Sequence, residues 1–404
     1  MKLLVSILLF ILFQGCQNQL TTTEQFNRWL KESGNINALD VQPFVSRPLT
    51  EDEASEAVHV VHTYLDGKLK EEFSEQWEER VLIRGEYKMP FEIKKFGIMP
   101  SDGWSVYISL HGGGNTTQSE NDKQWQNQIE LYQPKEGIYL VPRAPENTWD
   151  MWHKPYVDSL LNLLIQLTSV FEEVNTNKVY LTGYSAGGDG TYQLAPRMAD
   201  RLAAAAMIAG HPNDASPVSL RNLPFAIQVG ARDVAYNRTG IAHEWEQILD
   251  DLQANDPDGY VHDVKIYKGL GHWLEQRDTT ALNWMSQFSR NPYPQKINWD
   301  QNGKEHLRFY WLALPEEEKD YDAVILISRY GQVINIDELR NTDRLYIYLN
   351  DEMLNLDRNV VVNYNGEVLY DDIPVRTISS IWETMFTRND LQQVFSARIE
   401  VSLN

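Results

Sequence analysis

The feature that most constrains the fold is an alternation of strand-like and helix-like runs between residues 81 and 291. Several strand-like runs are continuously apolar, as is typical of parallel strands buried on both faces. Parallel strands need crossover connections, usually helices, so the alternation predicts an α/β domain whose mostly parallel sheet is covered by helices on both faces. We expect strands at residues 81–87, 91–96, 105–110, 137–141, 178–182, 203–209, 225–229 and 264–267, and helices at 154–171, 242–254 and 279–288.

The segments on either side of this domain follow other patterns. Residues 24–79 have helical spacing, and Thr50 ahead of three acidic residues is typical of a helix N-cap. After the prolines at 292 and 294, strands predominate, with one helix at 378–395 and a two-residue hairpin turn at Asn365-Gly366. These patterns predict a leader at 1–16, a helical segment at 17–80, an α/β domain at 81–291 and a β-rich domain at 295–404.

Charge and composition exclude several classes of partner. The 404 residues include 36 Lys and Arg against 57 Asp and Glu, a formal net charge of −21. Such an acidic surface repels phosphates, so nucleic acid and anionic lipid are not expected partners. No His, Asp or Glu cluster has metal-ligand spacing, and no glycine fingerprint for phosphate occurs, so we expect neither a metal nor a nucleotide cofactor. Nothing in the sequence indicates the oligomeric state.

The N-terminus predicts export. Lys2 precedes an apolar run over residues 3–13, which is too short to span a membrane comfortably, and Gly15-Cys16 follows it. This arrangement resembles a bacterial lipoprotein signal, in which the cysteine is acylated and becomes the mature N-terminus. The resemblance implies a lipid anchor at Cys16 and, because Gln17 is not acidic, the outer membrane or periplasm as the location. An ordinary secretory signal is the alternative.

Four motifs that follow predicted strands carry the chemistry. Residues 183–187 (GYSAG) come directly after the strand at 178–182, and a tight strand-to-helix turn of this kind exposes the central Ser185 as a nucleophile. Residues 111–114 (HGGG) end the strand at 105–110, where glycine amides can converge on an oxyanion. Asp233 follows the strand at 225–229 and His272 the strand at 264–267. All four therefore lie at the carboxyl ends of strands, where open α/β sheets place their sites.

The motifs and the chain order Ser185, Asp233, His272 resemble the α/β-hydrolase superfamily. Within it, the chain is similar to secreted esterases and prolyl-oligopeptidase-like peptidases that lack a large lid. The resemblance spans about residues 81–291. It implies a Ser185–His272–Asp233 triad and an oxyanion site made by the amides of Gly113, Gly114 and Ala186.

Other residues near these motifs have two interpretations each. Trp149 and Trp152 follow the strand at 137–141 and are either walls of a substrate site or core residues; His211 either contacts substrate or makes a local turn hydrogen bond. Asp189 is the rival for the triad acid, but the first helical turn after Ser185 should point it away from the histidine. His111 is expected to orient the glycine loop rather than carry protons.

These inferences predict a serine hydrolase that cleaves a carboxylic ester through an acyl-enzyme. Export suggests an extracellular ester such as an acylated plant polysaccharide. The alternatives are a prolyl-oligopeptidase-like peptidase and a non-catalytic glycan-binding or adhesion lipoprotein on a hydrolase scaffold. The interval between His211 and Phe225 is too short for a lid domain, so we expect an open cleft. The β-rich domain is either a packing partner or a module that binds polymeric substrate.

Overall fold

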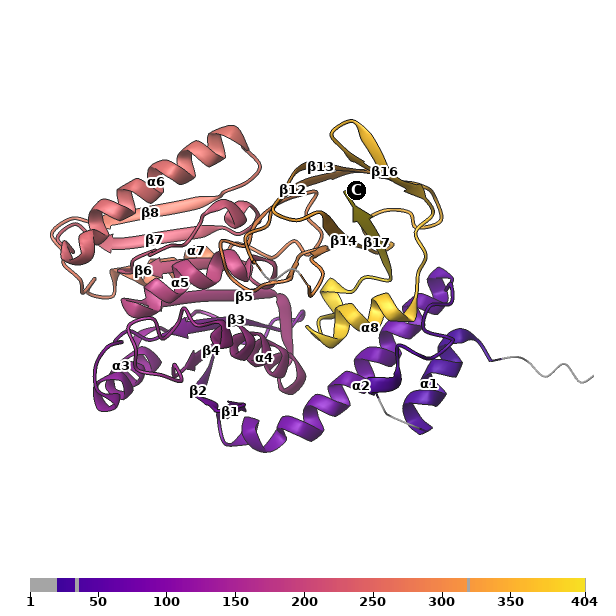
Figure 1. Cartoon of the computed structure of the whole chain (residues 1–404). Coiled ribbons are helices and arrows are strands. Elements are labelled where there is room, and N and C mark those ends of the chain that lie inside the picture. Colours follow the sequence, from indigo (N-terminus) through magenta and orange to yellow (C-terminus); the bar gives the residue numbers. More distant parts are fainter. Residues whose placement is uncertain (1–19, 33–35, 318–319, 404) are drawn as a thin grey trace, which may run out of the picture.

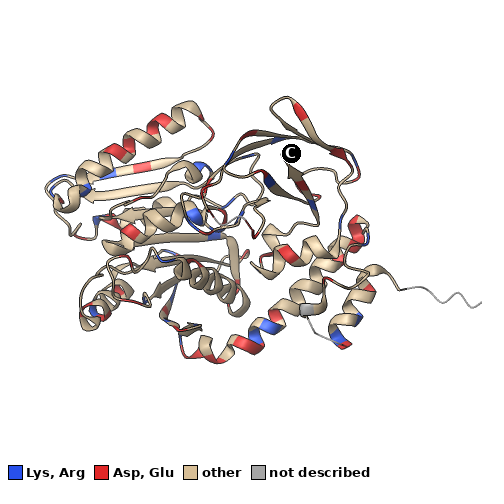
Figure 2. Cartoon of the chain, viewed as in Figure 1, with Lys and Arg blue, Asp and Glu red and all other residues tan. Residues whose placement is uncertain are grey.

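The computed structural model describes residues 20–32, 36–317 and 320–403, so the leader and Cys16 lie outside the described residues. The chain forms an α/β body beside a smaller, β-rich body, with N-terminal helices running along both (Figure 1). Acidic residues occur on many elements, including the helix α6 (Arg238–Asn255) (Figure 2).

An eight-stranded sheet forms the centre of the α/β body. Its order is β1-β2-β4-β3-β5-β6-β7-β8, antiparallel between β1, β2 and β4 and parallel from β4 to β8. The expected mostly parallel sheet is therefore confirmed. The strands are β1 (Val81–Arg84), β2 (Tyr87–Phe96), β3 (Trp104–Leu110), β4 (Gly137–Pro142), β5 (Val174–Tyr184), β6 (Ala204–Ile208), β7 (Phe225–Gly230) and β8 (His262–Tyr267).

Helices cover both faces of this sheet, as expected. The strands alternate their side chains, so that Val106 and Ile108 enter one core while Tyr107 enters another. The first core lies under α4 (Pro155–Phe171), α5 (Ala186–Arg197) and α6, and the second lies under α3 (Gln118–Leu131) and α7 (Thr280–Met285).

The helix α3 was not expected from the sequence. It is polar and buries few residues, among them Asn121 and Gln128, so it lacks the apolar stripe on which helix prediction depends. A local signal was nevertheless present, because Thr117 precedes Glu120 by three residues, as in a capping box. In the structure the Thr117 hydroxyl accepts the amide of Glu120 at 3.3 Å.

The connection between β6 and β7 contains only the short helix η3 (Val218–Asn222). No lid is present in residues 209–224, all of which the structure describes. This connection packs on the β-rich body instead, where the Ser219 hydroxyl accepts the amide of Asp300 at 2.9 Å.

The N-terminal segment is helical, in two main pieces. The helices are α1 (Thr22–Glu32), η1 (Ile36–Ala38) and α2 (Glu51–Glu78). The predicted cap at Thr50 is confirmed, since its side chain accepts the amide of Glu53 and the Glu53 side chain accepts the amide of Thr50. Both helices bury apolar faces against α8 (Ile378–Phe386).

The C-terminal part contains two sheets, of orders β10-β11-β14-β17 and β16-β15-β13-β12-β9. The turn at Asn365-Gly366 joins β15 and β16 as predicted, with both residues at positive φ. The helix expected at 378–395 is shorter in the structure, where α8 ends at Phe386. The strands are β9 (Lys296–Asp300), β10 (Arg308–Phe309), β11 (Leu312–Ala313), β12 (Val324–Tyr330), β13 (Val333–Arg340), β14 (Arg344–Leu349), β15 (Val360–Tyr364), β16 (Glu367–Asp372) and β17 (Ala397–Ser402).

Buried ion pairs fix the β-rich body to the α/β body. Asp390 lies 2.8 Å from Arg290 and 3.2 Å from Arg201, and all three side chains are almost fully buried. Burial alone would raise the pKa of Asp390, but the two guanidinium groups outweigh it and hold the pKa below its usual value. Asp200 of the α/β body pairs likewise with Arg388. These contacts favour the packing-partner interpretation of the β-rich region.

Candidate active site

The local backbone explains why Ser185 projects from the sheet. It joins β5 to α5 with φ 56° and ψ −120°, a conformation that a non-glycine residue adopts only under constraint. An ideal Cβ on Gly183 would lie 2.0 Å from the Gly187 carbonyl oxygen, and one on Gly187 would lie 2.1 Å from that of Leu110. Only glycine fits at these two positions, so the tight turn accounts for the spacing of the motif.

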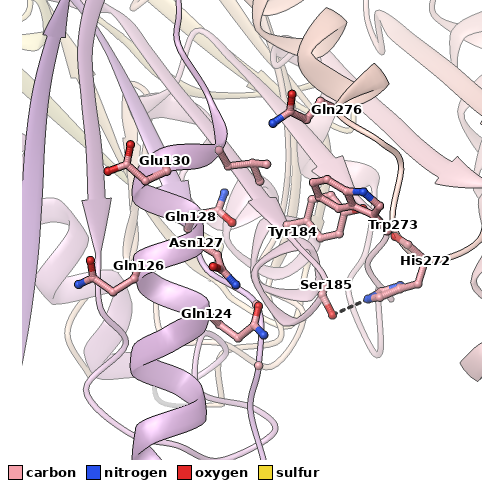
Figure 3. Close-up of a pocket in the computed structure, with 13 residues that line it drawn as sticks. Gln124, Gln126, Asn127, Gln128, Glu130, Tyr184, Ser185, His272, Trp273 and Gln276 are labelled. Carbon is pink, nitrogen blue, oxygen red and sulfur yellow. Dashed lines mark hydrogen bonds between the residues drawn. The ribbon is translucent and has the colours of Figure 1, made fainter.

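The structure brings Ser185, His272 and Asp233 into one chain of hydrogen bonds. His272 Nε2 lies 2.9 Å from Ser185 Oγ, and His272 Nδ1 lies 2.7 Å from Asp233 Oδ2 (Figure 3 shows the first contact). With Nδ1–H facing the carboxylate, Nε2 is left to accept the serine proton. Asp233 is 2% exposed, whereas the His272 side chain is 43% exposed. His272 is thus reachable from solvent and Asp233 is not.

The rival acid, Asp189, takes a different partner. The Asp189 Oδ1 accepts a hydrogen bond from the backbone amide of His211 at 2.6 Å, and burial raises the pKa of Asp189 to about 6.

Asp233 has a second charged neighbour besides His272. Arg238 lies 3.5 Å from Asp233 Oδ1 and so places a positive charge beside the carboxylate that contacts His272.

Tyr184 connects the Ser185 turn to the His272 loop and was not singled out from the sequence. Its hydroxyl donates to the His272 carbonyl oxygen at 2.7 Å and accepts the amide of Leu274 at 2.9 Å. Because Tyr184 directly precedes Ser185, its side chain links the turn that carries Ser185 to the loop that carries His272. The signal in the sequence is the aromatic residue at the second position of the GYSAG motif.

His111 orients the glycine loop, as expected. Its Nδ1 lies 2.6 Å from the Gly112 carbonyl oxygen, and its Nε2 accepts the amide of Ala144 at 3.1 Å. Burial lowers the pKa of His111 to about 3, so the ring is neutral at pH 7 and is already occupied by two partners. It has no role left for moving protons.

The predicted oxyanion donors need one correction. The Gly114 amide donates to Asn121 Oδ1 of α3 at 2.8 Å, so its hydrogen is not available to an oxyanion. Gly113 lines the pocket beside Ser185, and Ala186 is the first residue of α5, where amides have no acceptor within the helix. Gly113 and Ala186 therefore remain as candidate donors, and Asn121 holds the loop that carries Gly113.

A pocket of about 810 Å³ opens beside the Ser185 hydroxyl. One wall is α3, and the other is the loop that follows His272 (Figure 3). The lining residues are Gly112, Gly113, Gln124, Gln126, Asn127, Gln128, Glu130, Leu131, Tyr184, Ser185, His272, Trp273 and Gln276.

None of the three predicted substrate residues lines this pocket. Trp152 is fully buried, and its Nε1 donates to the His111 carbonyl oxygen at 3.0 Å, so the prediction of a substrate wall was wrong and the core interpretation holds. The Nδ1 of His211 accepts a hydrogen bond from the amide of Asn213 at 2.9 Å. This is the local turn hydrogen bond that was the alternative interpretation of His211. Trp149 is 57% exposed and lies next to Gly114, so its contact with substrate stays a prediction.

Two further findings concern the described part of the chain. Within residues 20–32, 36–317 and 320–403, no three His, Cys, Asp or Glu side chains are grouped to hold a metal ion. Over the same residues, no helix is both long enough and apolar enough to cross a membrane.

Part of the sequence matches a known family. Residues 130–302 match the dienelactone hydrolase family. The match contains Ser185, Asp233 and His272 but begins after the glycine loop. No curated protein matches the sequence.

Several solved structures resemble about half of the chain. A thermostable esterase is 16% identical with a TM-score of 0.38, and the match covers 52% of this chain and 62% of the esterase. The BES protein from Bacillus cereus is 14% identical with a TM-score of 0.39 and coverage of 51% and 93%. A ferulic acid esterase is 15% identical with a TM-score of 0.37 and coverage of 51% and 96%. Such distant likeness bears on neither mechanism nor substrate.

Proposed function

We propose that this chain, a hydrolase of the α/β-hydrolase fold, cleaves carboxylic esters with Ser185 as its nucleophile. The observation that carries the proposal is the hydrogen-bonded chain from Ser185 through His272 to Asp233 at the carboxyl ends of parallel strands. The family match supports an ester substrate, because a lactone is a cyclic carboxylic ester.

The chemistry follows from the geometry in two half-reactions. The Ser185 Oγ attacks the acyl carbon while His272 Nε2 takes its proton, and Asp233 stabilises the imidazolium. The oxyanion accepts hydrogen bonds from the Gly113 and Ala186 amides, the second of which also lies at the positive end of the α5 dipole. His272 then gives the proton to the leaving alcohol, and the acyl group stays on Ser185.

Water completes the reaction. His272 takes a proton from a water molecule that attacks the acyl carbon, and the same proton returns to Ser185 Oγ as the carboxylic acid leaves. The same residues serve both half-reactions. The His272 side chain is 43% exposed, so water can reach it.

A fluorophosphonate probe tests the proposal. The wild-type chain should be labelled covalently and should hydrolyse an aryl acetate, and Ser185→Ala should do neither while keeping its thermal unfolding transition. A folded wild-type chain that is not labelled would support the non-catalytic alternative instead.

The location is a separate proposal that rests on the sequence. We infer that the mature chain begins at an acylated Cys16 and is held at the outer membrane or in the periplasm by lipid. A single acyl chain gives only marginal membrane binding, so a stable anchor requires more than one chain at this residue.

A further inference from the structure

The pocket wall formed by α3 presents free amide side chains to the reaction centre. Gln124 and Asn127 are three residues apart and so lie on one face of the helix, and Gln276 lies across the pocket on the loop that follows His272 (Figure 3). Within the described chain, none of these three side-chain amides has a hydrogen-bond partner in the protein. Each offers two donors and one acceptor to a ligand.

The lining of the pocket has no uncompensated charge. Glu130 is its only carboxylate, and Lys94 pairs with it at 2.7 Å. No Lys or Arg is among the lining residues, and His272 is engaged by Asp233 and Ser185. Among the described residues that line the pocket, therefore, no charged group is free to select a carboxylate, a phosphate or the terminal amine of a peptide.

An aromatic surface lies beside these amides. Trp273 is 52% exposed, and its ring centroid is 5.8 Å from that of Tyr184, which is almost fully buried. The ring of Trp273 packs against the buried ring of Tyr184, and Trp273 also lines the pocket. Such a ring offers a flat apolar face to a ligand that is polar at its edges.

From these three observations we propose that the pocket binds a neutral, hydroxyl-rich ring, that is a sugar unit, joined to the ester that Ser185 cleaves. The inference rests on the proposed function. Sugar hydroxyls both donate and accept, as the amides do, and the C–H face of a sugar ring can pack on Trp273. An alkyl group would take the amides of Gln124, Asn127 and Gln276 out of water without replacing their hydrogen bonds, which is costly for each group.

Such a pocket should favour esters whose ring carries hydroxyl groups over esters whose ring carries none. A site built to hydrogen-bond substrate hydroxyls rejects analogues that lack them by roughly 10⁴-fold when its polar groups are buried by the ligand. The amides here are partly open to solvent, so we expect a preference of about 10²-fold.

Two esters with the same acyl group and nearly the same shape test the inference. In 6-O-acetylglucose the ring carries hydroxyls, and in cyclohexylmethyl acetate it does not. Wild-type kcat/KM should be about 10²-fold higher for the sugar ester. Gln124→Leu and Asn127→Leu should each reduce this ratio roughly three- to tenfold, the value of one lost hydrogen bond.

The matched control is Gln118→Leu, which removes an exposed amide from the same helix away from the pocket and should leave the ratio unchanged. Equal rates on the two esters would overturn the inference. So would hydrolysis of neither by a chain that the fluorophosphonate probe labels at Ser185, or a preference for N-acetylalanine methyl ester, which would indicate a peptide-like substrate. Each of these results leaves the proposed serine esterase intact, whereas absence of labelling contradicts the esterase itself.

Discussion

Replacing Tyr184 with phenylalanine should show whether its hydroxyl positions His272 for catalysis or only stabilises the fold. The change removes only a hydroxyl, which donates to the His272 carbonyl oxygen at 2.7 Å and accepts from the Leu274 amide at 2.9 Å. Leu274 is fully buried, so its amide loses a partner that water does not replace, at a cost of about 1–3 kcal/mol. The loop can lower that cost by moving, and His272 moves with it.

The expected result is a loss in turnover instead of a loss in binding. A displacement of about 1 Å at a catalytic group costs roughly 10²-fold, so kcat of Tyr184→Phe should fall by about 10- to 100-fold while KM stays within about twofold. Steady-state kinetics on an aryl acetate measure both constants, and the rate of fluorophosphonate labelling should fall in parallel with kcat.

Tyr180→Phe is the matched control. Tyr180 lies on the same strand and face, and its hydroxyl donates to a backbone carbonyl, that of Phe288, at 2.9 Å. This variant should lose a similar amount of thermal stability and keep its kcat. If Tyr184→Phe also keeps its kcat within twofold of wild type, the hydroxyl supports only the fold and the reasoning is refuted.

Four other perturbations have definite expected outcomes. Asp233→Asn should lower kcat by roughly 10⁴-fold through loss of histidine orientation, and near-normal hydrolysis would remove Asp233 from the triad. The pKa of Asp189 is raised from 3.8 to about 6, so at this group the folded chain binds a proton that the unfolded chain releases, and the stability that this group contributes should fall as the pH rises from about 4 to 6. Asp189→Asn should remove the contribution of this group to the pH dependence of urea unfolding, a change of up to about one proton between about pH 4 and 6, and should stabilise the chain at pH 7 by up to about 3 kcal/mol; an unchanged slope would contradict the assignment. Asp390→Asn should destabilise the chain by about 3–5 kcal/mol at pH 7 because two buried arginines lose their counter-charge, whereas a loss below 1 kcal/mol would mean that the ion pairs do not fix the two bodies together. Cys16→Ser should release the protein from membranes or leave its signal uncleaved, and a processed variant that still sediments with membranes would exclude the lipid anchor.

The convergence of the three residues of the proposed triad could be predicted from the sequence because the position of each along the chain is fixed by local structure. The turn at Ser185 needs glycine at 183 and 187 for steric reasons, and that need is written into the five-residue motif. Asp233 follows the buried strand β7 and His272 follows the half-buried edge strand β8, and parallel strands present their carboxyl ends at one edge of the sheet. Strand order then brings the three segments to the same edge of the sheet, and the loops set the final distances between the side chains. The cap at Thr50 and the turn at Asn365-Gly366 were predictable for the same reason, since neighbouring residues alone decide them.

What surrounds those groups was decided by tertiary structure. Sequence alone left Trp152 undecided between pocket and core, and packing placed it in the core, against Gly190 and the carbonyl of His111. The Gly114 amide looked free until α3, a helix without an apolar stripe, brought Asn121 within 2.8 Å of it. The same helix supplies six of the thirteen residues that line the pocket. Spacing along the chain reports which residues share a local turn or a face, but it does not report which polar groups from distant segments meet, because hydrogen-bond partners are chosen by three-dimensional proximity after the sheet has formed.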